Sequence, residues 1–86
     1  MREKLITSLQ IAREPEPPIL IRYYLLEETR GKDPLYGTKV VDETDQAAAV
    51  APGLTQDKQY ASELIARLVK GSVTPTGLAD VLADLL

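Results

Sequence analysis

The stretch Ile19–Glu28, ILIRYYLLEE, decides the fold of this chain. It is rich in β-branched and aromatic residues, which favour an extended strand. Successive residues of a strand point to opposite faces, so the stretch divides into two sets of side chains. One set is Ile19, Ile21, Tyr23 and Leu25, and the other is Leu20, Arg22, Tyr24 and Leu26. Because both sets are largely apolar, we predict a central strand that is buried on one face and has a second apolar face to cover.

Turn-forming residues lie on both sides of this strand. Residues 13–18 contain three prolines, which cannot donate to a strand ladder, and they separate the central strand from an alternating strand pattern at 5–12. Downstream, Thr29–Pro34 has the composition of a turn, and 35–42 predicts an antiparallel returning strand. Residues 47–51 form either a short fourth strand or nothing regular.

In the last third of the chain the apolar period changes from two residues to 3.6, which indicates helices. We predict one helix over 55–70, capped by Thr55, and a second over 74–86, capped by Thr74 with Pro75 at its first position. Strands followed by helices are typical of the α+β class. The expected fold is a single domain over all 86 residues: a small antiparallel sheet of three or four strands, packed on a C-terminal two-helix hairpin.

The composition excludes much chemistry. The chain has 86 residues and contains no histidine, cysteine, tryptophan or phenylalanine. This excludes zinc fingers, thiol and imidazole nucleophiles, and disulfide scaffolds. Asp80 and Asp84 lie one helical turn apart and are explained by a solvated helix face, while Glu27 and Glu28 point to opposite faces of a strand and cannot flank one glycosidic bond. We therefore expect no enzyme activity, no catalytic residue, no metal and no cofactor.

The charge balance bears on partners. Thirteen acidic and ten basic residues give a net charge of −3, which disfavours nucleic acid because duplex binding relies on an excess of Lys and Arg. Seven of the bases lie in residues 1–40, so a nucleic-acid-associated regulator is kept as an alternative, followed by a small-ligand or metal-binding domain. The apolar stretch 19–26 contains Arg22 and is far shorter than the roughly 20 residues of a bilayer span. We expect a cytoplasmic protein with no membrane partner.

The second apolar face of the central strand is the feature that points to function. A helical hairpin covers only one face, so the other is covered by loops, is partly exposed, or meets a partner. We predict a non-enzymatic protein-interaction or regulatory module that uses an apolar sheet face or a strand edge, most economically as a homodimer. The candidate interaction residues are Leu20, Tyr24 and Leu26.

A set of short segments resembles a known family. They are a Tyr-rich, Glu-ended strand, a Tyr-Gly pair, helical leucines and a Val-Thr-Pro step into the last helix: Tyr23–Glu28, Tyr36-Gly37, Leu64-Ile65, Leu68, Val73–Pro75, Leu78, Asp80-Val81 and Asp84. Together they resemble a family of small uncharacterised bacterial proteins, a domain of unknown function, over about residues 19–86. Thr38 stands where a larger apolar residue is expected. The resemblance implies that strands followed by a helix pair form a recurring unit, and it implies no activity, cofactor or catalytic residue.

Overall fold

Four antiparallel strands, in chain order, form a single sheet in the computed structural model, which describes residues 1–85. The strands are β1 (Arg2–Ile11), β2 (Ile19–Arg30), β3 (Asp33–Asp42) and β4 (Ala47–Thr55). They are followed by helix α1 (Lys58–Lys70), a 3₁₀ turn η1 (Pro75–Gly77) and helix α2 (Leu78–Leu85). The predicted α+β class is confirmed, and the sheet has four strands rather than three.

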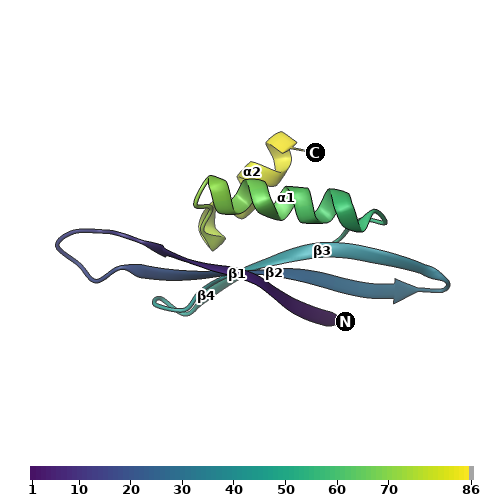
Figure 1. Ribbon diagram of the computed structural model, residues 1–86, viewed down its shortest axis with the longest axis horizontal. Coiled ribbons are helices and arrows are strands. Elements are labelled where there is room, and N and C mark those ends of the chain that lie inside the picture. The colour runs from purple at the N-terminus through teal and green to yellow at the C-terminus, as the bar shows by residue number, and fades with distance from the viewer. Residues whose placement is uncertain (86) are drawn as a thin grey trace.

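Both helices lie on the same side of the sheet, and the opposite side of the sheet is bare in the described part of the chain (Figure 1). Helix α1 packs over β2, β3 and β4, and η1 lies against β3 and β4. The long hairpins reach beyond the helices at both ends, and the molecule measures 50 × 24 × 17 Å. The helices therefore cover the middle of one face and leave a whole second face without a layer.

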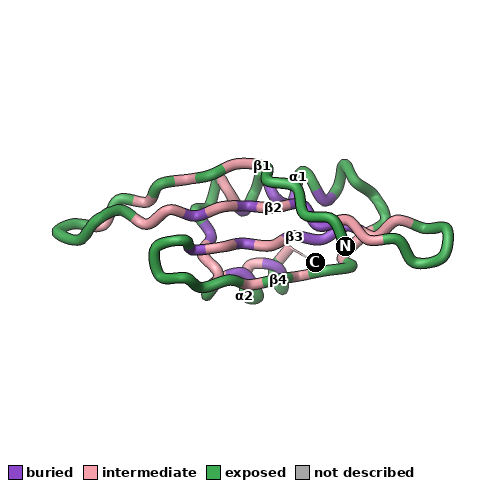
Figure 2. The backbone as a smooth tube through the Cα atoms, turned by 90° about the horizontal axis from the view of Figure 1, so that it is seen from below, coloured by how far each residue is buried: buried purple, intermediate pink, exposed green. Residues whose placement is uncertain are grey.

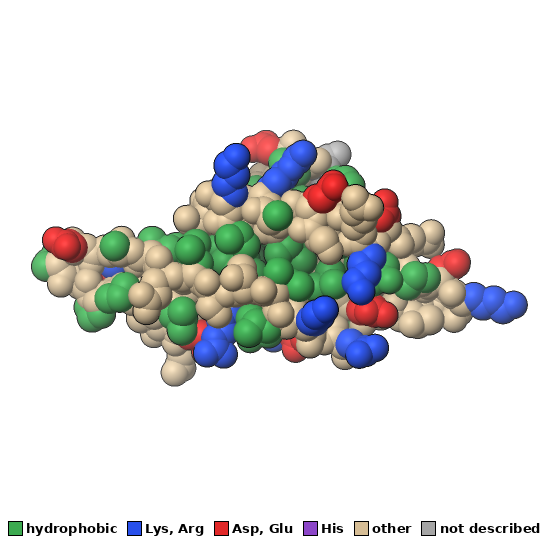
Figure 3. Space-filling model, in the orientation of Figure 1, with side chains coloured by type: hydrophobic (Ala, Val, Ile, Leu, Met, Phe, Trp, Pro, Cys, Tyr) green, Lys and Arg blue, Asp and Glu red, His purple; other side chains and the backbone are tan. Residues whose placement is uncertain are grey.

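The core lies between the helices and the strand residues that face them. Purple segments in Figure 2 mark its buried positions along β2 and β3. The sheet and the helices contribute to one cluster: Ile21, Tyr23, Leu25, Tyr36, Val40, Ala61, Leu64, Ile65, Leu68, Val73, Leu78 and Leu82. Figure 3 shows hydrophobic side chains gathered along the seam between the helices and the sheet. One of the two apolar sets of the central strand, Ile19, Ile21, Tyr23 and Leu25, therefore packs in this core, as predicted.

Two buried polar side chains are satisfied inside this layer. The Tyr23 hydroxyl donates to the carbonyl of Val73 at 2.8 Å and so ties the sheet to the connection between the helices. Thr38 is buried, and its hydroxyl donates to the carbonyl of Tyr24 at 3.0 Å. A hydroxyl of this size can be buried because its hydrogen bond compensates for the loss of water. Thr38 therefore occupies the place where a larger apolar residue was expected.

The start of α1 differs from the prediction. Thr55 is the last residue of β4 and does not cap the helix; the N-cap is Asp57, whose carboxylate accepts hydrogen bonds from the amides of Gln59 and Tyr60 at 2.9 and 3.3 Å. The hydroxyl of Thr55 instead accepts a bond from the amide of Asp57 at 3.1 Å. Both residue types are good caps, and the extension of β4 places Asp57, rather than Thr55, at the free amides.

The second helix also begins later than predicted. Thr74 is extended and makes no side-chain capping bond, whereas Pro75 does stand at the first position of the 3₁₀ turn that precedes α2. Val73 and Leu78 flank this turn, and both are buried in the core. Packing of these two residues, rather than a hydroxyl cap, fixes the entry into the last helix. The prediction extended this helix to residue 86, which lies outside the described residues.

Candidate interaction face

The face of the sheet that points away from the helices is here called the open face. Its side chains form transverse rows, because directly opposite residues of antiparallel strands point to the same side. One row crosses all four strands and consists of Leu5, Tyr24, Lys39 and Val50. Leu5 is 48% exposed and Val50 is 53% exposed, while Tyr24 and Lys39 between them are partly buried. This central row places two exposed aliphatic side chains on either side of an aromatic ring.

A second row runs beside the central row and combines small and charged residues. It consists of Ser8, Arg22, Val41 and Ala48. Nη1 of Arg22 lies 3.7 Å from Oε1 of Glu43. Nε of Arg22 is buried without a hydrogen-bond partner among the described residues. Beyond this row, Leu20 pairs with Gln10 and is partly buried. The structure therefore places Leu20 and Tyr24, two of the three predicted interaction residues, on one partly exposed surface.

Leu26, the third predicted residue, is on the same face but is only 2% exposed. It pairs with Gly37, and a Cβ on Gly37 would collide with the carbonyl oxygen of Ala51 and lie 2.7 Å from the Cα of Pro52. The backbone of β4 therefore crosses the open face at this point and lies beside Leu26. Sequence reasoning included Leu26 because alternation alone does not reveal this covering strand, and Leu26 is not part of the exposed surface.

A bulge in β4 produces this crossing. Tyr36 pairs with Thr55 and Thr38 pairs with Ala51, so three residues of β4 stand opposite one residue of β3. Within the bulge, Gly53 has a φ of +64°, a backbone conformation that side-chain-bearing residues rarely adopt. A bulge bends its strand and ends regular pairing. Pro52-Gly53 thus lies within β4, beyond the short strand that was considered over residues 47–51.

Lys39 lies across the centre of the open face. Its Nζ is 5.7 Å from the centre of the Tyr24 ring and 2.7 Å from Oε1 of Glu3. The hydrogen bond from Lys39 to Glu3 raises the pKa of the ammonium group above its usual value. The lysine is therefore held as a cation over the aromatic ring, and its methylene chain adds apolar area to the face.

The two free edges of the sheet are poorly suited to pairing with a strand of another chain. The outer strand β1 has an irregularity between Leu5 and Thr7 and begins with the charged run Arg2–Lys4. The other outer strand, β4, is interrupted by its bulge at Pro52. Bulges, charges and proline are the devices by which edge strands avoid pairing with other chains.

Residues 2–86 match the model of a family of unknown function, DUF6514. The chain belongs to this family. The match includes β1, which the resemblance over residues 19–86 did not reach. No curated protein and no solved structure matches the chain. Membership of DUF6514 assigns no activity, and the bacterial origin implied by the resemblance stays a prediction.

The ten basic residues of this DUF6514 member do not all lie on one surface. Arg13 lies in the loop after β1, 3.4 Å from Glu16, and Arg22 and Lys39 pair with acids on the open face. Arg30 is the last residue of β2 and borders the turn between β2 and β3, at one end of the sheet. In Figure 3 the blue side chains alternate with red ones over the visible surface. The nucleic-acid alternative therefore gains no support from the arrangement.

Carboxylates likewise do not converge. Asp80 and Asp84 are exposed on α2, and no group of three potential metal ligands occurs within residues 1–85. Asp42 is buried, and its Oδ1 accepts bonds from the amides of Thr44 and Asp45 at 2.9 and 3.0 Å, so its role is to close the turn before β4. None of the helices in the described chain is both long and apolar enough to cross a membrane.

Proposed function

We propose that this chain is a non-enzymatic protein-interaction module that pairs with a second copy of itself through the open face. The observation that carries the proposal is the central row, in which Leu5 and Val50 are about half exposed on either side of Tyr24. Packing a second sheet against it is the usual way to bury such a face. Tyr24 offers a large apolar area and a hydroxyl at low cost in side-chain entropy, which suits an interface anchor.

Charge complementarity favours a second copy over a strongly charged partner. The charged side chains that pair on and beside the face are Lys39 with Glu3 and Arg22 with Glu43, so positive and negative groups balance. A two-fold interface brings residue i of one copy to residue j of the other and the reverse, which makes a balanced face complementary to itself. A polyanion or a highly basic protein would meet repulsion from half of these groups.

The size of the face also fits self-association. Four strands of about 9 to 12 residues, at ~3.3 Å per residue and ~4.8 Å between strands, give a face of roughly 600–750 Å². Each partner of a standard interface contributes about 800 Å². One face of this sheet is therefore close to the area that a specific dimer needs.

The oligomeric state tests the proposal directly. We expect light scattering after size-exclusion chromatography to give twice the monomer mass of 9.4 kDa at high micromolar concentration. Val50→Asp should return the chain to the monomer, because it places a charge in the central row of the buried face. Ser62→Asp, at an exposed position on α1, is the matched control and should leave the dimer intact.

Two results would overturn the proposal. One is a wild-type chain that stays monomeric at high micromolar concentration. The other is a dimer that Val50→Asp weakens no more than Ser62→Asp does, since this would place the contact elsewhere. Circular dichroism of each variant establishes that a loss of association is not a loss of folding.

A further inference from the structure

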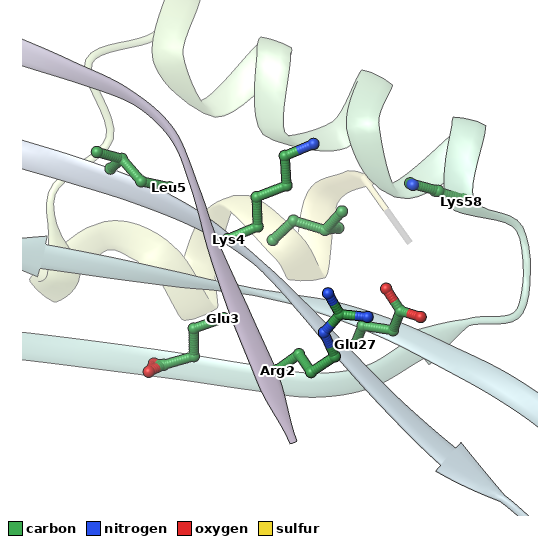
Figure 4. Close-up of a pocket in the computed structure, with 7 residues that line it drawn as sticks. Arg2, Glu3, Lys4, Leu5, Glu27 and Lys58 are labelled. Carbon is green, nitrogen blue, oxygen red and sulfur yellow. The ribbon is translucent and has the colours of Figure 1, made fainter.

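A hollow of about 600 Å³ lies on the helix side of the sheet, where the start of β1, the end of β2 and the first turn of α1 meet. Arg2 pairs with Glu27 and Lys4 pairs with Leu25, so these four side chains share the helix face of the sheet. Lys58 faces them from α1 (Figure 4). The hollow exists because α1 packs over β2, β3 and β4 and leaves the first residues of β1 uncovered.

The charges in this hollow are unbalanced, in contrast to those of the open face. Arg2, Lys4 and Lys58 line it, and none of the three has an acidic side chain of residues 1–85 within 4.0 Å. In Figure 4 Glu27 projects toward the same space, whereas Glu3 points away from it. Three cations and one facing carboxylate give this site a net charge of +2 in a chain whose net charge is −3.

From this arrangement we infer an anion-binding site for a small organic molecule that carries at least two negative charges, as phosphate or carboxylate groups. Arg2 supplies a planar group that binds either oxyanion in a bidentate manner, and Lys4 and Lys58 supply point charges from two different elements. Glu27, at the side of the cations, is placed to accept a hydrogen bond from a hydroxyl or amine of the same molecule. The buried side chain of Leu25 forms an apolar floor.

The volume and the setting select a small ligand rather than a polymer. Pockets for small molecules enclose about 300–1,000 Å³, and this hollow lies within that range. The cations come from one end of β1 and the beginning of α1, so they form a local cluster rather than a track for a phosphate backbone. The charged side chains of Arg2, Lys4, Glu27 and Lys58 are on the helix side of the sheet, and Leu5 of the central row borders the same hollow. The inference rests on these charged side chains and does not depend on dimerisation.

Titration with two probes tests the site, inorganic pyrophosphate for phosphate ligands and tricarballylate for carboxylate ligands. We expect saturable shifts in ¹H–¹⁵N spectra confined to the amides of residues 2–5, 25–27 and 57–60. The probe that binds more tightly assigns the oxyanion. Both probes act on the folded full-length chain, and neither depends on an activity.

Charge variants give the decisive comparison. Lys4→Gln combined with Lys58→Gln should weaken probe binding by about tenfold, since charge-assisted hydrogen bonds are lost. Arg30→Gln combined with Lys32→Gln removes the same charge at the exposed turn between β2 and β3 and should leave binding nearly unchanged. Glu27→Gln should strengthen binding, because it removes the carboxylate that repels an anion.

The inference fails if neither probe saturates, if the shifts spread over the whole surface, or if both double variants lose binding equally. Binding of duplex nucleic acid that is tighter than that of both probes and lost in Lys4→Gln/Lys58→Gln would overturn it as well, because the same cations would then serve a polymer. Lys4, Arg30, Lys32 and Lys58 are exposed and Glu27 is partly buried, so we expect every variant to stay folded. Thermal unfolding of each variant checks this.

Discussion

Tyr23 carries two functions in the fold through one side chain. Its ring is fully buried between the sheet and the helices, and its hydroxyl donates to the carbonyl of Val73 across fifty residues of sequence. A buried carbonyl without a hydrogen-bond donor destabilises the fold, because it has lost its hydrogen bonds to water and has formed none in the protein. The side chain therefore links the strand that decides the fold to the step that begins the last helix.

Removal of the Tyr23 hydroxyl should lower the stability of the fold. We expect Tyr23→Phe to lower the free energy of unfolding by about 1–3 kcal/mol, because the carbonyl of Val73 stays buried without its donor. Urea denaturation measures the change. Tyr60→Phe is the control, since Tyr60 is exposed on α1, and its effect should remain within about 0.5 kcal/mol. Equal effects of the two variants would contradict the role given to Tyr23.

The same residue predicts how stability changes at high pH. Burial raises the pKa of Tyr23 above its usual value of 10.0, so the unfolded chain loses this proton at a lower pH than the folded chain does. Stability should therefore fall as the pH rises above 10.0. Lys39, whose pKa is raised by Glu3, acts in the same direction. Unfolding measured against pH should show a shallower decline in Tyr23→Phe than in the wild type; parallel curves would contradict the burial effect.

At the scale of elements, the bulge of β4 is the feature that local sequence did not predict. Ala47–Ala51 is weak in strand propensity, and Pro52-Gly53 resembles a stop, so a full strand to Thr55 appears only once pairing with β3 is known. The central strand was predictable because it is rich in β-branched and aromatic residues, and α1 was predictable because its apolar residues recur with a period of 3.6. The choice between Thr55 and Asp57 as the cap depended on where β4 ends.

A substitution at Gly37 tests where the bulge places the backbone of β4. Gly37→Ala should destabilise the chain by about 1–3 kcal/mol, because the new Cβ meets the backbone of Ala51 and Pro52 rather than a movable side chain. Gly77→Ala, where a Cβ meets nothing within 4 Å, is expected to be neutral or slightly stabilising. Thermal unfolding compares the two. If Gly37→Ala is as harmless as Gly77→Ala, β4 does not cross the open face as described.

At the scale of the whole molecule, the sheet is a layer with helices on one side and a bare surface on the other. The sequence indicated that a second apolar face exists, and it identified Leu20 and Tyr24. It could not identify Leu5 and Val50, because their place in the same row as Tyr24 depends on the register of three strand pairs. Leu26 was wrongly included among the exposed residues, because the alternation of the central strand does not show that β4 covers it.

Contacts between copies test the central claim, which is that open faces pack together. A sample that mixes isotope-labelled and unlabelled chains allows a filtered NOE experiment to detect only contacts between molecules. We predict such contacts from the methyl groups of Leu5, Val41 and Val50, and none from Leu64 or Leu78 on the helix side. An absence of intermolecular contacts at high micromolar concentration, or contacts that come only from the helices or the strand edges, would contradict the account.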